Sequence, residues 1–505
     1  MQTEEIFIVK LPLKVELWQQ HILDRRFEYC REIYNNLRSK IIRQLHYYQN
    51  TNEWKEIEQL TNYKEKSKRT QEFIKKHNLP FSEYGLISYV SKFLPRYKQY
   101  GFNSTILENI SGNLWLGLEK YLYGKGKKLA YKEKDAFNVY KTRVKKGSFN
   151  GIKLDLTKST LTININGKTG KNGKYMTIPF IINSKSDYEM FCFTTSNEIR
   201  EVIIQREKIR GEWKYYVSFS IKGKKPTKGR EIGKGQVGID LGPSSIAIAS
   251  KNKVYIDELG KGIANIEHEN KILLRKMDRS RRQNNPLQFN ENGTIKTYKK
   301  GERPEWVYSK NYIKLKNKLR ENYRRRKALL KLSHINLANE VLTYGDNFIV
   351  ENNPIASWCK RAKETTKNEK GKFKKKKRFG KSIQNHAPSI FIEILKNKVN
   401  SLGGTLNKID IKNGASQFDF TNGEKTKHEL KERRITLSNG NTHLRDTLSA
   451  FNLQHFQNKE FNVVEMNENY LNFCNLEKQE IERHKGNKVL KSFVTLYINA
   501  NSNTG

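Results

Sequence analysis

Two apolar segments of this chain end on a carboxylate, and that feature restricts the folds that it can adopt. Residues 237–241 read Val-Gly-Ile-Asp-Leu with the acid at Asp240, and residues 348–351 read Phe-Ile-Val-Glu with the acid at Glu351. A buried strand gains nothing by ending on an unpaired charge, because its desolvation costs several kcal/mol. A third acid, Asp446, opens a stretch of helical pattern. A cation bound among the three carboxylates would remove that cost, so we expect a fold that brings them together.

Each of these acids also has an ordinary structural explanation. Asp240 precedes a Gly-Pro pair at 242–243, and aspartate is a common turn former. Glu351 is followed by Asn-Asn-Pro at 352–354 and could cap the next helix. Asp446 could favour a helix N-terminus through the helix dipole. The order of strand, strand and helix favours the shared site over these three separate explanations.

The excess of basic residues predicts a polyanionic partner. Lys plus Arg is 96 against 52 for Asp plus Glu, which gives a formal net charge of +44. A folded chain with that excess repels itself, and phosphate backbones are the commonest polyanions that relieve the repulsion. A generally basic protein without such a partner is the alternative. With 36% hydrophobic and 11% aromatic residues, the chain should fold, and 505 residues predict about three domains.

The cysteines and the N-terminus indicate a reducing, intracellular setting. The four cysteines are far apart, so their spacing predicts neither a zinc ribbon nor a disulfide framework, and we expect core thiols. The N-terminus lacks the pattern of a signal peptide, and no run of about 18 apolar residues occurs. A cytoplasmic protein with no membrane contact is expected. The cysteines are Cys30, Cys192, Cys359 and Cys474.

The first half of the chain predicts a helical domain inserted into a small β-barrel. Residues 5–15 predict a strand that ends near Pro12, and apolar residues from 23 to 45 recur every three or four positions, as on one face of a long helix. Further helical patterns cover 53–77 and 104–123. From Gly151 the period changes to two, which predicts antiparallel strands that the N-terminal strand completes.

The second half begins as a ribonuclease-H-like sheet would. The strand with Asp240 is followed by two more expected strands, at 246–250 and 254–256, joined by a tight turn. The next 90 residues are mostly helical in pattern and very basic. Residues 310–331 contain ten Lys or Arg against one Glu, with Ile313, Leu319, Leu329 and Leu330 on an expected apolar side.

Two basic segments are candidate phosphate contacts. In the first, a solvated helix face is the alternative to nucleic-acid binding. The second, within residues 361–381, has little apolar content and predicts a loop that orders on nucleic acid, with nuclear targeting as a weaker alternative. The candidate residues are Arg324, Arg325 and Arg326 in the first segment, and Lys374, Lys375, Lys376, Lys377 and Arg378 in the second.

The three acidic motifs resemble those of the split RuvC domain in TnpB nucleases and in the compact type V CRISPR effectors related to them. Residues 10–20 and 29–37 also resemble the opening strand and first recognition helix of these proteins, so the resemblance runs from residue 5 to about 456. The residues that carry it are Gly238-Ile239-Asp240-Leu241-Gly242 with Ala247 and Ser250, Ile349-Val350-Glu351-Asn352, Ala415-Ser416-Gln417, and Arg445-Asp446 with Ala450, Asn452 and Leu453.

The resemblance implies a multidomain α+β protein that contains a ribonuclease-H-like (RuvC) nuclease domain. It also implies how the chain is divided. The implied parts are a wedge β-barrel at 1–15 and 146–228, a helical recognition lobe at 16–145, a split RuvC domain at 229–414 and 441–460, a degenerate target-nucleic-acid-binding segment at 415–440, and a C-terminal extension of unknown role at 461–505.

This chain departs from the family pattern at two places. TnpB proteins usually carry a four-cysteine zinc ribbon before the third acid, whereas residues 418–440 contain no cysteine, so we expect no zinc. The usual Asn-Ala pair after the third acid is Leu448-Ser449 here. These departures favour a divergent type V effector over an ordinary transposon nuclease.

The resemblance also implies residue roles. Asp240, Glu351 and Asp446 would form the catalytic and metal-binding triad, with two Mg²⁺ ions expected. Arg445 is expected either to contact a phosphate or to form a structural salt bridge. The implied function is an RNA-guided DNA endonuclease that cuts guide-matched double-stranded DNA beside a short flanking motif, acting in a prokaryotic cytoplasm as a monomer or homodimer on one guide RNA.

Two other functions remain open from the sequence. The same fold could serve as a cleavage-inactive RNA-guided DNA-binding repressor. It could also serve as an RNA-independent transposase or resolvase of the ribonuclease-H-like class. Retention of all three acids favours an active nuclease over the repressor, because an inactive site has no need of carboxylates that are costly to bury.

Overall fold

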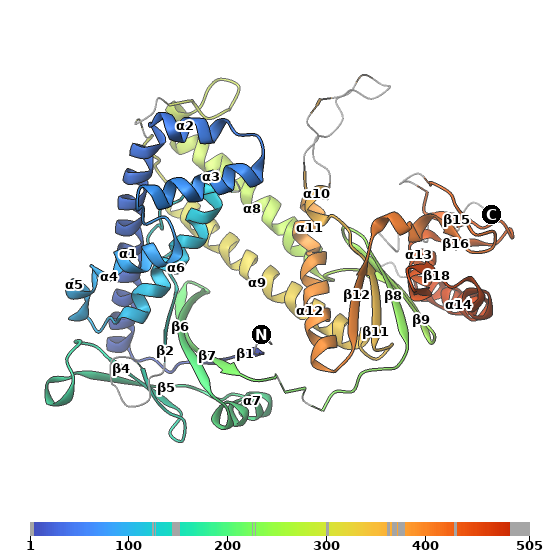
Figure 1. Ribbon diagram of the computed structural model, residues 1–505, viewed down its shortest axis with the longest axis horizontal. Coiled ribbons are helices and arrows are strands. Elements are labelled where there is room, and N and C mark those ends of the chain that lie inside the picture. The colour runs from blue at the N-terminus through green and yellow to red at the C-terminus, as the bar shows by residue number, and fades with distance from the viewer. Residues whose placement is uncertain are drawn as a thin grey trace. The chain divides into compact units, whose positions relative to one another are not determined.

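The chain divides into two compact units, Met1–Pro226 and Thr227–Gly505, each with its own core (Figure 1). The division falls in a stretch rich in glycine and lysine, residues 222–235. This computed structural model describes residues 5–123, 126, 128–143, 152–224, 226–227, 229–298, 302, 304–360, 364–365, 371, 379–428 and 432–484.

The first unit begins with the predicted helices. Helix α1 (Leu17–Gln49) confirms the long amphipathic helix, and its apolar face is buried from Leu23 to Leu45. The helical pattern over 53–77 is confirmed and forms two helices, because the side chain of Asn62 accepts hydrogen bonds from the backbone N–H groups of Lys64 and Glu65 and starts a new helix. The helices after α1 are α2 (Asn52–Gln59), α3 (Tyr63–Lys76), α4 (Glu83–Ser91), α5 (Leu94–Lys98), α6 (Ser104–Leu122) and α7 (Lys185–Ser196).

Two antiparallel sheets complete the first unit, in place of one closed barrel. They are linked where Leu13, just after the N-terminal strand, pairs with Phe180. Residues 139–143 form a strand in which Tyr140 and Thr142 are buried, so the helical segment predicted to reach residue 145 is shorter. The first sheet joins β1 (Ile6–Pro12), β7 (Glu212–Lys222), β6 (Ile199–Ile209) and β2 (Val139–Arg143); the second joins β3 (Ile152–Asp155), β4 (Thr160–Asn164) and β5 (Tyr175–Pro179).

A five-stranded mixed sheet organises the second unit. The first three strands of this sheet in chain order, β8 to β10, form an antiparallel meander. This confirms the strands predicted around residues 246–256. Strand β11 is parallel to β8 on one side and to β12 on the other. The spatial order is β10 (Lys253–Glu258), β9 (Ser245–Ser250), β8 (Gln236–Leu241), β11 (Asn347–Glu351) and β12 (Thr405–Ile409).

Helices cover both faces of this sheet. On one face, α9 (Lys310–Val341) and α12 (Pro388–Ser401) share a core with the apolar residues of β8 and β11. On the other face lies α13 (Arg445–Gln454), with Ala450 and Leu453 fully buried. A Cβ on Gly238 would lie 2.0 Å from the carbonyl oxygen of Ala450, so glycine at this position allows α13 to cross the strand that carries Asp240.

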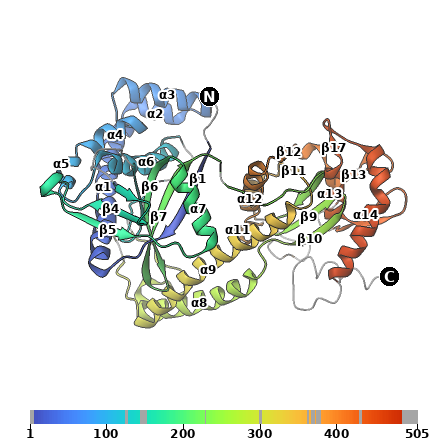
Figure 2. The ribbon, with the colours of Figure 1, turned by 90° about the horizontal axis from the view of Figure 1, so that it is seen from below.

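The long basic helices of this unit run side by side (Figure 2). They are α8 (Ile263–Asn284) and α9, followed after β11 by the short helices α10 (Ile355–Trp358) and α11 (Gly380–His386). The apolar side predicted for residues 310–331 is partly wrong, because Ile313 and Leu329 are exposed while Leu319 and Leu330 are buried. Among the helices described, none is long and apolar enough to cross a membrane.

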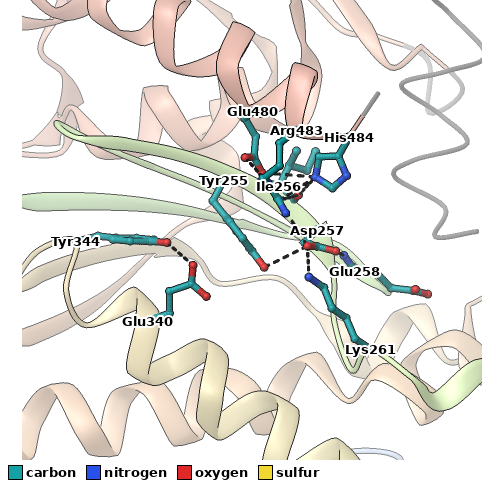
Figure 3. Close-up of polar contacts among 10 residues, drawn as sticks. All are labelled: Tyr255, Ile256, Asp257, Glu258, Lys261, Glu340, Tyr344, Glu480, Arg483 and His484. Carbon is teal, nitrogen blue, oxygen red and sulfur yellow. Dashed lines mark hydrogen bonds and ion pairs between the residues drawn. The ribbon is translucent and has the colours of Figure 1, made fainter. Parts of the chain in front are cut away.

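The last described helix, α14 (Val463–His484), packs against the edge strand β10 (Figure 3). The backbone N–H of Ile256 donates to the Glu480 carboxylate at 2.8 Å, and Nε2 of His484 lies 2.8 Å from the Ile256 carbonyl oxygen. Arg483 bridges to Asp257 at 3.5 Å and to Glu480 at 2.6 Å. The helix therefore covers a strand edge whose open hydrogen-bonding groups would otherwise invite pairing with another chain.

The cysteines differ from the prediction that all four are core thiols. All are free, but only Cys30 is buried; Cys474 is half-buried, and Cys192 and Cys359 are exposed. Burial raises the pKa of Cys30 to about 12, as expected of an inert core thiol. The other three lie on helices or loops whose burial the spacing of cysteines along the sequence does not reveal.

Candidate active site

Asp240 and Glu351 lie at the carboxyl ends of two neighbouring parallel strands. Strand β8 pairs with β11 up to Ile239 and Val350, so the two acids occupy the next positions on both strands. Neighbouring strands are about 4.8 Å apart, and side chains alternate between the faces in step, so both acids belong to the same face of the sheet. This edge is where α/β sheets commonly place their ligand sites.

Asp446 reaches the same site from the first turn of α13. The pKa of Asp240 is raised well above its ordinary value by burial first, and then by the negative charges of Asp446 and Glu351. Arg445 opposes that shift in the pKa of Asp240. The structure thus brings together three acids that are far apart in the sequence.

Ser449 also lies beside Asp240. It is fully buried on α13, one turn after Asp446; its hydroxyl opposes the rise in the pKa of the Asp240 carboxyl, although it has no partner at hydrogen-bond distance among the described residues. The sequence marked Leu448-Ser449 only as a departure from the family pattern. Its position in the structure gives the serine a place next to a candidate metal ligand.

Glu351 is held by the loop that precedes the third acid. Burial raises the pKa of Glu351, while the backbone N–H of Ala415 partly offsets this by donating to its Oε1 at 3.3 Å. Ala415 begins the single turn η4 (Ala415–Gln417). Buried Asn452 on α13 fixes that turn, because its amide donates to the carbonyl oxygens of Ala415 and Phe418 at 2.8 and 2.9 Å. One helix therefore carries an acid of the site and anchors the loop that contacts another.

Arg445 forms a salt bridge within the site. Its Nε and Nη2 donate to Oδ1 of Asp446 at 3.2 and 3.1 Å, and Nη1 of Arg433 lies 3.8 Å from Oδ2. The sequence left two roles open for Arg445, a phosphate contact or a structural salt bridge. In the structure Arg445 forms the salt bridge, with Asp446. Arg433 was missed by sequence reasoning, since a basic residue in a basic segment carries no signal of its own.

The three carboxylates are the type of ligand that a divalent cation prefers, but their side chains are not arranged around one ion position. Oxygen donors are the ligands that Mg²⁺ prefers, and the like charges that raise the pKa of Asp240 call for a cation. Within the described residues, however, no group of three or more His, Cys, Asp or Glu is placed to hold a metal ion. Asp446 accepts a hydrogen bond from Arg445, and Glu351 accepts one from the backbone N–H of Ala415. For Asp446 to bind one of the expected metal ions, it would have to give up the Arg445 guanidinium.

The predicted arginine cluster is split between different surroundings. Arg324 pairs with Glu321 at 2.6 Å on the same helix. Arg326 pairs with Glu267 of α8 at 2.6 Å, and both side chains are only 15% exposed. Only Arg325 of the three is exposed, because successive helix residues point in different directions. Residues Lys374 to Lys377 and Arg378 lie outside the described residues.

The segment predicted to bind target nucleic acid consists of short hairpins around Asp419. This carboxylate accepts hydrogen bonds from the N–H and hydroxyl of Ser438 at 2.7 and 2.8 Å and from the N–H of Thr421 at 2.9 Å. Burial alone would raise the pKa of Asp419, but these bonds lower it. Hydrogen bonds thus join the two hairpins. They are β13 (Phe418–Asp419) with β14 (Glu424–Lys425), and β15 (Arg434–Thr436) with β16 (Thr442–Leu444).

Comparison with known proteins finds similarity only among solved structures. No protein-family model matches this chain, and no curated protein matches it by sequence. The cryo-EM structure of a Cas12f1–sgRNA–target DNA complex matches with a TM-score of 0.48 and 13% identity, over 86% of this chain and 83% of that chain. A CRISPR-Cas12f ternary complex matches with a TM-score of 0.28 and 14% identity, over 87% and 82% of the two chains.

A third structure, of the mini-RNA-guided endonuclease CRISPR-Cas_phi3, matches with a TM-score of 0.27 and 11% identity, over 58% of this chain and 57% of that chain. At these values the superpositions assign no role to any residue. The chain is similar to compact type V CRISPR effectors, and the roles of its site residues depend on their own geometry.

Proposed function

We propose that this chain is a metal-dependent, RNA-guided DNA endonuclease with a single nuclease site formed by Asp240, Glu351 and Asp446. The observation that supports this most is the meeting of the three acids at one edge of one sheet, where the two neighbours raise the pKa of Asp240. A sheet of three antiparallel strands followed by two parallel ones, crossed by a helix with the third acid, fits the ribonuclease-H-like fold that the sequence predicts.

The residues of the site divide the work between cation and substrate. Asp240 and Glu351 would hold a divalent cation from neighbouring strands, and Asp446 would complete the site after turning from Arg445. Divalent cations in such sites activate a water and stabilise the leaving oxygen of a phosphodiester. Arg445 and Arg433, released from Asp446, would then donate to a phosphate of the DNA.

The guide-RNA part of the proposal comes from the resemblance of the acidic motifs to TnpB and type V effectors. In this scheme, base pairing with the guide selects the DNA, so the protein holds backbone phosphates and reads only a short flanking motif. The net charge of +44 suits a protein that grips a guide RNA and a DNA duplex.

The direct test is cleavage by the full chain purified with its co-expressed RNA. The wild type should cut DNA that matches the RNA when Mg²⁺ is present, and Asp240→Ala should abolish cutting while RNA binding persists. Asp278→Asn is the matched control, because the ion pairs of Asp278 within the described part of the chain are local ones on α8, with Arg281 and Arg282. Equal cutting by wild type and Asp240→Ala would refute the proposed site. Activity that survives ribonuclease treatment would refute guidance by RNA.

One observation favours a second candidate function, an RNA-guided DNA binder that does not cut. The bond from Arg445 to Asp446 occupies an acid that the nuclease needs. In that case the complex should retard matching DNA on a gel without cutting it in any divalent metal. Wild-type cleavage in Mg²⁺ or Mn²⁺ would exclude this function.

A further inference from the structure

A cavity of about 370 Å³ lies among helices of the second unit, apart from the three acids. Its walls come from α8, α9 and α11 together with Cys359, which follows α10. Cavities of this size are typical of sites for small organic ligands. We call it the α8–α9–α11 cavity. It is lined by Glu267, Asn270, Lys271, Leu274, Tyr323, Arg326, Cys359, Gly380, Lys381 and Gln384.

Within the part of the chain that the structure describes, one buried polar group of a lining residue has no hydrogen-bond partner. Asn270 is 3% exposed, and its Oδ1 accepts a hydrogen bond from Asn322 at 3.1 Å. That bond leaves the Nδ2 amide as the donor of this side chain, and within the described residues Nδ2 has no hydrogen-bond acceptor. A buried donor without an acceptor is unfavourable by about 1–3 kcal/mol, so this part of the wall is not a fully satisfied core.

The cavity is positively charged. Among the described residues, Lys271, Lys381 and Arg326 line it against one carboxylate, Glu267. Arg326 pairs with Glu267 at 2.6 Å, and Lys381 lies 3.8 Å from its other oxygen. The single carboxylate balances one of the three cations, which leaves an excess that suits an anionic group such as a phosphate.

The cavity also presents an aromatic and apolar surface. Tyr323 is 42% exposed and Leu274 is 46% exposed, although tyrosine and leucine side chains are commonly buried in protein cores. An exposed tyrosine ring beside basic side chains is how proteins hold the bases of single strands, by stacking on the ring and pairing the phosphate with a cation. The guanidinium of Arg326 lies 5.5 Å from the Tyr323 ring and extends this surface.

We propose that the α8–α9–α11 cavity binds one unstacked nucleotide of a single-stranded nucleic acid. The base stacks on Tyr323, and the phosphate pairs with Lys271 and Lys381. This site rests on the proposed nucleic-acid partner but not on cleavage. The sequence marked Arg326 as a candidate phosphate contact. In this proposal Arg326 is part of the wall of the cavity.

Cys359 supplies the readout, because it is an exposed free thiol that lines the cavity. The full chain, freed of nucleic acid in high salt, is alkylated with and without a short oligodeoxyadenylate, and the modified peptides are quantified by mass spectrometry. At ten times its Kd the oligonucleotide should slow alkylation of Cys359 about tenfold, since only the unoccupied fraction reacts. Cys192, exposed in the first unit, is the internal control and should react at an unchanged rate.

Three comparisons decide the outcome. Tyr323→Ala should raise the oligonucleotide concentration that half-protects Cys359 about tenfold, and the matched control Tyr84→Ala, an exposed tyrosine on α4, should leave it unchanged. The proposal is overturned if the oligonucleotide leaves Cys359 unprotected, if the same strand in a duplex protects equally well, or if only free adenosine 5′-monophosphate protects. Asp240→Ala should keep the protection, so loss of cutting and loss of this pocket are told apart.

Discussion

Among single residues, Asp446 has the most consequential surroundings, because a guanidinium and a metal ion would compete for it. Arg445 donates twice to one of its oxygens, and Arg433 approaches the other. Such a charge-assisted pair stabilises the carboxylate without a metal. Any divalent cation at the site must therefore displace Arg445 or share Asp446 with it, and the affinity for the cation reflects that competition.

Arg445→Ala should increase the affinity of the site for divalent cations and reduce the rate of DNA cutting. Removal of one positive charge beside the metal should lower the Mg²⁺ concentration for half-maximal cutting about tenfold. The maximal rate should fall, because the variant has no guanidinium at residue 445 to donate to a phosphate of the DNA. Arg434→Ala, an exposed neighbour of Arg433 on β15, should change neither value. An unchanged Mg²⁺ requirement in Arg445→Ala would show that Arg445 does not compete with the metal.

Among the elements, α14 protects the open edge of the sheet. Its Glu480 is 2% exposed and takes hydrogen bonds from Arg483 and from the backbone N–H of Ile256 (Figure 3). Burial alone would raise the pKa of Glu480, but the hydrogen bonds from Arg483 and the Ile256 N–H, with the His484 ring 3.6 Å away, outweigh burial and lower it. The charged carboxylate is therefore the form that holds the helix to β10.

The docking of α14 should weaken in acid. Because the folded pKa of Glu480 lies below the ordinary glutamate value, its stabilisation is present above that value and is lost as the pH falls through the lowered one. Glu480→Gln should reduce local stability at neutral pH by about 2 kcal/mol and lessen its acid dependence. Hydrogen exchange of α14 amides at several pH values measures both effects.

Glu468→Gln, exposed on the same helix, is the matched control and should leave the exchange unchanged. If Glu480→Gln exchanges like the wild type at neutral pH, the carboxylate does not hold α14 to the strand.

The elements also show how far the sequence could be interpreted. Local periodicity predicted α1 and the strands of the meander, and the acids at strand ends predicted where the site would form. Local periodicity missed strand β2, because Val139–Arg143 has too few alternating apolar residues to be distinguished from a loop. It also missed the pairing of Arg326 with Glu267 and of Glu480 with Ile256, since these depend on which distant elements meet.

Across the whole molecule, the charge of +44 is the property that most affects binding. Ion pairs with the 52 acids do not balance it, so phosphates and their displaced counterions should supply most of the sequence-independent affinity. In the proposed function, selection of a particular DNA would then fall to base pairing with a guide RNA and to a short flanking motif.

The affinity for DNA of unrelated sequence should therefore depend steeply on salt. For about six phosphate contacts, the dissociation constant should rise about a thousandfold between 50 and 200 mM salt. Fluorescence anisotropy with a labelled duplex measures this, and a neutral solute of matched osmolality serves as the control. A dissociation constant that changes less than about threefold over this range would contradict an electrostatic grip.

The convergence of the three acids on a divalent cation is tested most directly by a crystal structure of the chain with Mn²⁺ and DNA, in which anomalous scattering locates the metal. The account predicts anomalous peaks bound by carboxylate oxygens of Asp240, Glu351 and Asp446, with Asp446 turned from Arg445. A structure with no metal at these oxygens, and with Asp446 still bound to Arg445, would contradict it.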